Sequence, residues 1–213
     1  MEKRRIFQAP LSGQAPRSAL FLDRDGVLIE DRHHLSDPRD VRLCTGSLQL
    51  LRHACQLGWP VVVITNQSGI ARGYFDWQAY ERVTGRLVEL LGADAQLAAI
   101  YANGHGPDAP ANSWRKPSPA MLLVAAEDLN LDLSRSLLVG DRLSDLQAGA
   151  RAGLALVAHV LSGHGKCERS AVMSYADQGG RFTGEIHQPQ LLLLDYLHDF
   201  PLQLMGSTSR LTK

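Results

Sequence analysis

Short apolar runs alternate with longer amphipathic segments along most of this chain, and this alternation constrains its fold most strongly. The short runs have the length and composition of fully buried strands. Strands that alternate with helices through right-handed crossovers form a parallel sheet with helices on both faces. The pattern therefore predicts an α/β fold. The expected strands are Ser18–Leu22, Pro60–Ile64, Leu97–Tyr101, Ser136–Val139 and Leu154–Val157.

Four amphipathic helices are expected among these strands, each with apolar residues three or four positions apart. Asp76 and Ser118 are suitable N-caps, and Pro119 fits a first helical turn. Gly153 is a stop signal for the last of the four. The expected helices are Gly46–Leu57, Trp77–Leu90, Met121–Leu129 and Leu143–Ala152.

The chain shows no internal repeat and no interdomain linker, so we expect one domain after an N-terminal arm. The arm is basic and is expected to be solvated, including Arg4 and Arg5. The expected divisions are an arm at 1–17, a domain at 18–213 with its motif core at 18–160 and a C-terminal loop and helix at 161–213, an irregular surface segment at Ser162–Gln190, and a final helix near Gln190–Asp199.

Composition excludes several classes of partner. Twenty-two basic residues balance twenty-two acidic ones, so no net charge favours nucleic acid or an anionic membrane. Cys44, Cys55 and Cys167 are odd in number and scattered, which suits a reducing compartment. No apolar run has the length of a signal peptide or a bilayer span. We expect a cytoplasmic monomer without a nucleic-acid or membrane partner.

Short polar residues follow three of the predicted strands. Asp23 and Asp25 follow the first strand in "DRDG", Thr65 begins "TNQSG" after the second, and Asp141 follows the fourth in "GDR". In open parallel sheets, ligands bind beyond the carboxyl ends of the strands, where the strand order reverses. These polar groups are therefore expected to gather at one edge.

The two carboxylates of Asp23 and Asp25 lie two positions apart. In an extended segment they share one face, while Arg24 points away. They repel each other unless a cation relieves the repulsion. With Asp141 they would form an oxygen site that suits Mg²⁺, and a carboxylate nucleophile beside Mg²⁺ indicates an aspartyl-phosphate intermediate.

Two further groups complete a site for phosphoryl transfer. Thr65 and the amides after it can donate to phosphate oxygens, and Lys116 offers a compact positive charge. Each signal alone has a simpler interpretation: a turn at "DRDG" or Asp141, a helix cap at Thr65-Asn66, a solvated charge at Lys116. In this order and at strand ends, they favour phosphoryl transfer.

The segments that carry these residues resemble the motifs of the haloacid dehalogenase (HAD) superfamily of phosphohydrolases, in the same order along Ala19–Asp145. "FLDRDGVL", "VVVITNQSGIARG", "RKPSPAMLL" and "LLVGDRLSDLQAGARAG" are similar to the family of D-glycero-D-manno-heptose 1,7-bisphosphate 7-phosphatases and histidinol-phosphate phosphatases, over Ser18–Val160. The resemblance implies a Rossmann-like domain without a large cap domain. It also implies a Mg²⁺-dependent phosphatase for a small sugar phosphate, with the heptose bisphosphate as the expected substrate.

The resemblance also assigns roles to residues. Asp23 would be the nucleophile, and Asp25 the general acid that later becomes the base for water. The catalytic residues implied are Asp23, Asp25, Thr65 and Lys116. The metal ligands implied are Asp23, Asp25 through its backbone carbonyl, Asp141, and Asp145 through water. The substrate-binding residues implied are Asp31, Arg32, His33, His34, Asn66, Gln67, Ser68, Arg115 and Arg142.

One loop departs from the family pattern. Family members often carry a zinc loop with several cysteines before the R-K-P motif. Here "YANGHGPDAPANSWRKP" contains His105 and no cysteine, whereas a structural zinc needs about four ligands. We expect no structural zinc, and we expect turns and Trp114 packing to stabilise the loop at 102–114.

Other functions share part of this pattern. A phospho-acceptor module would store phosphate on Asp23, but an acid–base at Asp25 favours turnover. A DNA 3′-phosphatase would share the T-N-Q motif, but neutral net charge argues against it. A histidinol-phosphate phosphatase would differ in substrate rather than in reaction. "GHGKC" matches only part of a phosphate-binding P-loop and is given no role.

Overall fold

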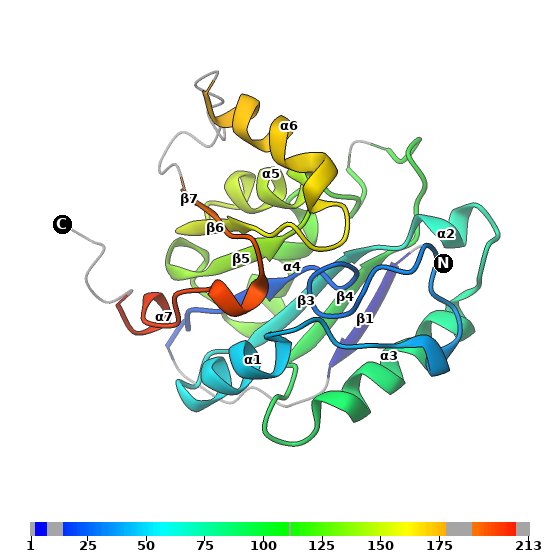
Figure 1. Ribbon diagram of the computed structural model, residues 1–213, viewed down its shortest axis with the longest axis horizontal. Coiled ribbons are helices and arrows are strands. Elements are labelled where there is room, and N and C mark those ends of the chain that lie inside the picture. The colour runs from blue at the N-terminus through cyan, green and yellow to red at the C-terminus, as the bar shows by residue number, and fades with distance from the viewer. Residues whose placement is uncertain (1–2, 8–14, 111, 178–188, 208–213) are drawn as a thin grey trace.

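The computed structural model describes residues 3–7, 15–110, 112–177 and 189–207. Its strands form one seven-stranded sheet in the order β1-β4-β3-β2-β5-β6-β7 (Figure 1). Neighbouring strands are parallel, except for β1, which pairs antiparallel with β4. The strands are β1 (Lys3–Phe7), β2 (Leu20–Leu22), β3 (Val61–Asn66), β4 (Ala99–Asn103), β5 (Leu137–Gly140), β6 (Leu156–His159) and β7 (Gln190–Leu193).

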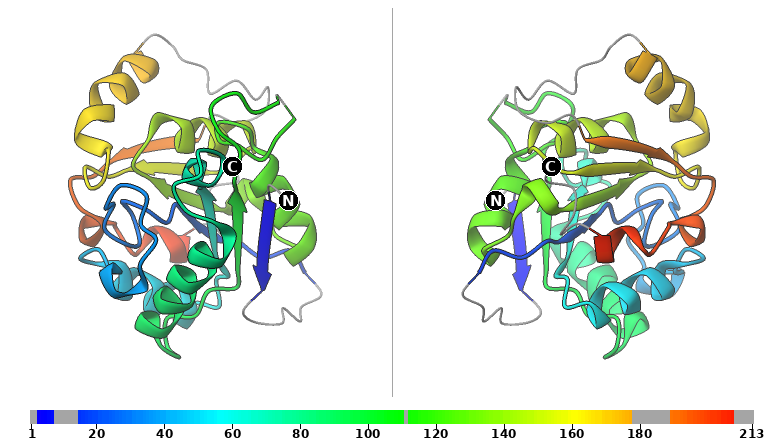
Figure 2. Two further views of the ribbon diagram at one scale, coloured as in Figure 1. Left: turned by 90° about the vertical axis from the view of Figure 1, so that its right-hand side faces the viewer. Right: turned by 90° about the vertical axis from the view of Figure 1, so that its left-hand side faces the viewer.

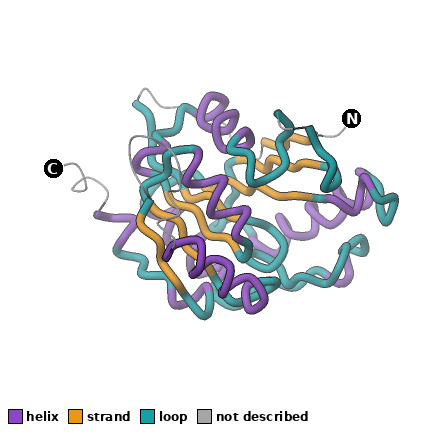
Figure 3. The backbone as a smooth tube through the Cα atoms, turned by 90° about the horizontal axis from the view of Figure 1, so that it is seen from above, coloured by secondary structure: helices purple, strands orange, loops and turns teal. Residues whose placement is uncertain are grey.

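Helices cover both faces of this sheet, as expected for a parallel α/β fold (Figures 1 and 3). In the described residues none of them is both long enough and apolar enough to cross a bilayer. The α-helices are α1 (Ser47–Gln56), α2 (Ser68–Ala71), α3 (Trp77–Leu91), α4 (Ala120–Leu129), α5 (Leu143–Arg151), α6 (Gly165–Asp177) and α7 (Leu204–Ser207). Three 3₁₀ turns lie at Pro38–Asp40, Leu133–Arg135 and Leu197–Asp199.

Two apolar layers form because successive strand side chains point to opposite faces. In β2, Leu20 and Leu22 pack with the buried residues of α1 and α3, whereas Phe21 packs with those of α4, α5 and α6. The five inner strands are apolar on both faces and form unbroken apolar runs in the sequence, which explains why the pattern predicted them.

The four predicted helices are confirmed as α1, α3, α4 and α5, with small differences at their ends. Asp76 caps α3 as expected, since its carboxylate accepts the Ala79 amide at 2.8 Å. The N-cap of α4 is Pro119 rather than Ser118, although the Ser118 hydroxyl accepts the Ala120 amide at 3.3 Å. Most of the five strands end about two residues beyond the predicted ends, because polar site residues such as Thr65 continue the ladder opposite Ala102.

The expectation of a solvated N-terminal arm is wrong for Lys3–Phe7. This segment is β1, and it covers the outer edge of β4 over its full length. Its basic side chains made it look like a solvated arm. In the fold they lie over aromatic rings, with Arg4 against Trp77 and Arg5 against Trp114.

Two expectations for the C-terminal part are also wrong. Gly165–Asp177 is helix α6 rather than irregular chain, and its Val172 joins the apolar layer over α5. Gln190–Leu193 is edge strand β7 rather than the start of a helix, because a run of four residues carries no period that separates the two states. The expected irregular chain at 178–188 lies outside the described residues.

The sheet order places the polar strand ends together. The chain leaves β2 towards β3 and β4 on one side, and later adds β5, β6 and β7 on the other. The order therefore reverses between β2 and β5, where ligand sites form in such sheets. The Asp23 amide donates to the Val139 carbonyl at 3.1 Å, so the segment after β2 stays joined to β5.

The Ser136 hydroxyl ties β2 to the start of β5, and this tie predicts a stability effect. The hydroxyl is fully buried, accepts the Ala19 amide at 2.9 Å and donates to the Asp132 carbonyl at 2.6 Å. Ser136→Ala leaves that amide unsatisfied, so we expect a loss of about 1–3 kcal/mol in unfolding free energy. Urea unfolding measures this as a lower midpoint at constant slope. Exposed Ser134→Ala is the control, expected within about 0.5 kcal/mol of wild type. Equal midpoints for both variants would contradict the role of Ser136.

Candidate active site

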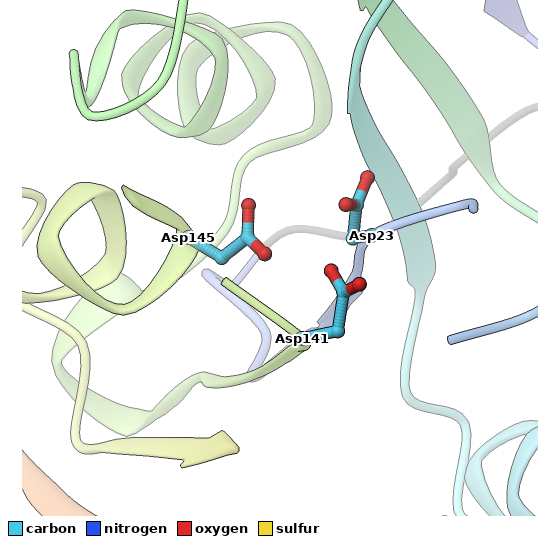
Figure 4. Close-up of side chains that lie close together, drawn as sticks. All are labelled: Asp23, Asp141 and Asp145. Carbon is cyan, nitrogen blue, oxygen red and sulfur yellow. The ribbon is translucent and has the colours of Figure 1, made fainter. Parts of the chain in front are cut away.

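Three buried carboxylates converge beyond the ends of β2 and β5. Asp23 follows β2, Asp141 follows β5, and Asp145 lies in the first turn of α5. Figure 4 shows their side chains pointing toward one another. One oxygen of each lies within 4.8 Å of the others, and in the described part of the chain this is the only such group that could hold a metal. The predicted gathering of Asp23 and Asp141 is confirmed.

Burial and mutual repulsion make the charged form of this cluster unfavourable on its own. Burial raises the pKa of Asp141 to about 8, and the charges of Asp145 and Asp23 add to the rise. Burial also raises the pKa of Asp23 to about 6, although the Lys116 ammonium opposes the rise. The cluster therefore favours a bound cation, which would stabilise the ionised forms of Asp23 and Asp141.

The residues present fit Mg²⁺. Oδ1 of Asp141 is buried without a hydrogen-bond partner among the described residues, whereas Oδ2 accepts the His164 amide at 2.7 Å. A bare carboxylate oxygen in an all-oxygen cluster is the donor that Mg²⁺ prefers. Gly26 and Gly163 close over this carboxylate at φ +86° and +56°, and a Cβ at either would lie within 2.5 Å of Oδ2. Asp23 and Asp141 are suited to hold the metal directly.

Asp145 contacts both the buried lysine and the main chain of α5. One of its oxygens lies 2.7 Å from the Lys116 ammonium, and the other accepts the Arg142 amide at 3.0 Å. The water-mediated metal contact that the resemblance implied for Asp145 stays a prediction.

Lys116 is a buried cation held between carboxylates. Its ammonium lies 2.9 Å from Oδ1 of Asp23 and donates to the Ile64 carbonyl at 3.0 Å. Burial lowers the pKa of Lys116, but Asp145 and Asp23 outweigh it and raise the pKa above the ordinary value. The two carboxylates therefore favour the charged form of Lys116.

Asn66 fixes the main chain of Lys116 from both sides. Its Oδ1 accepts the Lys116 amide at 3.1 Å, and its Nδ2 donates to the Lys116 carbonyl at 3.3 Å. The resemblance implied substrate contact for Asn66. In the structure its amide group instead holds the main chain of Lys116.

Asp25 lies in a separate network at the edge of the cluster. Arg24 donates to it twice at 3.1 Å, and Gln67 donates at 2.8 Å. The same Gln67 Nε2 lies 2.8 Å from the Thr65 hydroxyl, so Gln67 couples two expected catalytic groups. Its buried amide group is thus also committed inside the protein.

The expectation that Arg24 points away from Asp25 is wrong. Strand β2 ends at Leu22, so the alternation of faces does not extend to Asp25. Arg24 is 1% exposed and stacks on the Tyr80 ring at 5.0 Å, with its guanidinium turned back to the Asp25 carboxylate. The Asp25 carboxylate is therefore outside the three-carboxylate cluster, which leaves only its backbone carbonyl as the predicted metal ligand.

An open cleft of about 600 Å³ lies above these groups. Arg32 does not line it and instead pairs with exposed Glu30 at 2.8 Å, so the structure does not bring Arg32 to the site. The remaining expected substrate-binding residues do line the cleft: Asp31, His33, His34, Asn66, Gln67, Ser68, Arg115 and Arg142.

Arg72 and His164 are among the cleft residues that sequence reasoning missed. Arg72 lines the cleft together with Arg115 and Arg142. Burial lowers the pKa of Arg115, and the positive charges of Arg72 and Arg142 lower it further. His164 supports Asp141 through its amide and pairs with Asp31 at 2.8 Å through its ring. Arg72 lies in "TNQSGIARG", one of the family motifs, whereas His164 lies in "GHGKC", which matches only part of a P-loop.

The loop after β4 is stabilised by turns and by Trp114, as predicted. The Ala109 amide bonds to the Gly106 carbonyl at 3.2 Å, and the Ser113 amide bonds to the Pro110 carbonyl at 2.9 Å. Trp114 is 5% exposed and packs against Tyr101 at a centroid distance of 5.8 Å. The absence of zinc stays a prediction.

Comparisons with known proteins agree with this geometry. Residues 113–183 match the model of the HAD-hydrolase-like family. A D-glycero-β-D-manno-heptose-1,7-bisphosphate 7-phosphatase of Mesorhizobium japonicum is 52% identical over 144 residues, which are 64% of this chain and 66% of that protein. The enzyme of the same name from Helicobacter pylori strain J99 is 40% identical over 63% of this chain and 78% of its own length.

A solved structure extends the similarity over most of the chain. The D,D-heptose 1,7-bisphosphate phosphatase of B. bronchiseptica, complexed with magnesium and phosphate, superposes with a TM-score of 0.73 at 31% identity. The match covers 89% of this chain and 99% of that protein. The chain belongs to the D-glycero-D-manno-heptose-1,7-bisphosphate 7-phosphatase family of HAD-like hydrolases.

Proposed function

We propose that this chain removes the 7-phosphate of D-glycero-D-manno-heptose 1,7-bisphosphate. One observation carries the proposal: a buried cluster of Asp23, Lys116 and Asp145 forms the floor of a cleft. Arg72, Arg115 and Arg142 also line this cleft. The floor suits the reacting phosphate, and the arginines suit a second phosphate on the same small molecule. The names of the most similar relatives support the same substrate.

The residues of the floor divide the reaction into two displacements. Asp23 attacks phosphorus in line, so an aspartyl–phosphate bond forms and the bond from phosphorus to the sugar oxygen breaks. Lys116 and the Thr65 hydroxyl bind the transferring phosphoryl group. Magnesium, when bound by Asp23 and Asp141, neutralises charge on the phosphoryl oxygens.

Asp25 handles the protons in both displacements. It gives a proton to the departing sugar oxygen and then takes one from the water that attacks the phosphoaspartate. That attack releases inorganic phosphate and restores the Asp23 carboxylate. Gln67 bridges Asp25 and Thr65, so proton transfer and phosphate binding are aligned by one side chain.

The arginines of the cleft favour a bisphosphate over histidinol phosphate. A substrate with one phosphate and a cationic amine would place positive charge in a cleft lined by Arg72, Arg115 and Arg142. A second phosphate would neutralise this charge instead. The M. japonicum and H. pylori relatives are named for the β anomer, so we expect higher kcat/KM for the β anomer.

We further propose that the enzyme is a cytoplasmic monomer that binds neither nucleic acid nor membrane. Its basic and acidic residues balance at twenty-two each, which supplies no long-range attraction to a polyanion. Light scattering after gel filtration is expected to give the mass of one chain, 23.3 kDa.

The nucleophile and the acid–base make distinct predictions for phosphate release. Asp23→Asn should abolish Mg²⁺-dependent release from the heptose bisphosphate, because the attacking oxygen is replaced by an amide. Asp25→Asn should slow it on the order of 10²-fold or more. Wild-type rates in the Asp23→Asn protein would remove the proposed nucleophile. Histidinol phosphate and 3′-phosphorylated DNA serve as the competing substrates.

Arg115 is predicted to grip the distal part of the substrate. Arg115→Ala should lower kcat/KM for the bisphosphate roughly 10- to 100-fold, the effect of losing a charge-assisted hydrogen bond. A small generic phosphate ester lacks the distal group and should lose little. The assay compares the two substrates in wild type and variant. Equal losses on both would reject the distal role.

Metal binding predicts a thermal shift that depends on Asp141. At a hundredfold excess over its dissociation constant, Mg²⁺ should raise the wild-type Tm by roughly 5–10 °C, equivalent to about 2.7 kcal/mol. Asp141→Asn should lose this shift. In the absence of metal the variant should melt no lower than wild type, because it relieves repulsion among the carboxylates. A variant that retains the full shift would place the metal elsewhere.

A further inference from the structure

Strand β1 presents two different faces to the rest of the molecule. Side chains alternate along a strand, so Lys3 and Arg5 share one face and Arg4 lies on the other. Lys3 Nζ lies 5.2 Å and the Arg5 guanidinium 5.1 Å from the centre of the Trp114 ring. Arg4 instead lies over Trp77 at 5.1 Å and pairs with Glu81 at 3.1 Å. Figure 2 shows β1 at the edge of the sheet beside β4.

The Lys3 and Arg5 face encloses Trp114 in an aromatic and charged cluster. Tyr101 of β4 packs against Trp114, and its hydroxyl donates to Asp128 of α4 at 2.9 Å. Arg5 pairs with the same Asp128 at 3.3 Å. A loop tryptophan is thus held from β1, β4 and α4 together, which explains its 5% exposure.

Trp114 directly precedes the two cations of the site, and these two are held differently. Lys116 is held independently of Trp114. Asn66 hydrogen-bonds to its main chain, and its ammonium contacts two carboxylates and the Ile64 carbonyl. Arg115 donates to the His105 carbonyl at 3.2 Å, a group of the same loop. A displaced Trp114 would therefore move Arg115 and the loop together, while Lys116 stays in place.

We propose that the Lys3 and Arg5 face of β1 is a positioning device for Arg115. It clamps Trp114 by two cation–π contacts and thereby sets where the Arg115 guanidinium enters the cleft. Strand β1 would then affect substrate affinity through the position of Arg115, without contacting the substrate itself. This inference rests on the proposed function, because it takes Arg115 as the group that binds the distal phosphate.

The double variant Lys3→Gln/Arg5→Gln tests the device while keeping side chains that suit a strand. KM for the heptose bisphosphate should rise roughly three- to tenfold, the effect of one displaced hydrogen bond. Its kcat, and kcat/KM for a small phosphate ester, should stay within about twofold, since Lys116 and Asp23 keep their places. Arg4→Gln is the matched control, because it removes a cation–π contact and an ion pair from the same strand on the other face. It should leave KM unchanged.

A double-mutant cycle separates positioning from general destabilisation. In an Arg115→Ala background, Lys3→Gln/Arg5→Gln should raise KM no further, because the group that it positions is gone. Additive increases, or an increase of the same size for Arg4→Gln, would overturn the proposal. Trp114→Leu is the second variant and should reproduce the KM effect at temperatures where circular dichroism shows a folded protein.

Hydrogen exchange supplies a readout that needs no substrate. Amides of the loop at 104–110 and 112–115 should exchange faster in Lys3→Gln/Arg5→Gln than in wild type, and at the wild-type rate in Arg4→Gln. Unchanged exchange in the double variant would contradict the clamp. A wild-type enzyme inactive on the bisphosphate would instead contradict the proposed function, so the two failures differ.

Discussion

The buried ammonium of Lys116 is the constraint on which the rest of the site depends. A cation removed from water is stable only beside opposite charge, and here Asp23 and Asp145 supply it within 3 Å. These contacts fix Asp23 and the first turn of α5 with one group. Asp141 lies beside these two carboxylates, and its Oδ1 has no hydrogen-bond partner among the described residues. The cluster is therefore suited to a metal ion.

Sheet topology explains why residues from distant parts of the chain meet around this lysine. The reversal of strand order between β2 and β5 brings Asp23 beside Asp141, and β3 carries Thr65 to the same edge. Hydrogen bonds from main-chain and side-chain amides then fix the positions of the residues that the sheet topology brings together. Asn66 hydrogen-bonds to the Lys116 main chain, and Gln67 bridges Asp25 and Thr65. The His164 amide binds one oxygen of Asp141, and the other oxygen has no hydrogen-bond partner among the described residues.

Sequence reasoning predicted the parts whose signal is local. Asp23 and Asp141 could be found because each directly follows an apolar run, and the helices because their apolar period is clear. The orientation of the Arg24 side chain could not be predicted in this way. Strand β2 ends at Leu22, so the alternation of side chains on which the prediction relied does not reach Arg24. Strand β1 was hidden because its cations look solvated in sequence and lie over aromatic rings in the fold. Such pairings depend on tertiary contacts that no local pattern contains.

The stereochemical course of the reaction tests most directly whether Asp23 bonds covalently to phosphorus, as proposed. A substrate whose reacting phosphorus is made chiral by sulfur and one heavy oxygen isotope, hydrolysed in water that carries a second heavy isotope, yields chiral inorganic thiophosphate for analysis. Each in-line displacement inverts phosphorus, so attack by Asp23 followed by attack by water predicts net retention. Net inversion would mean a single direct attack by water, and would contradict the role assigned here to Asp23.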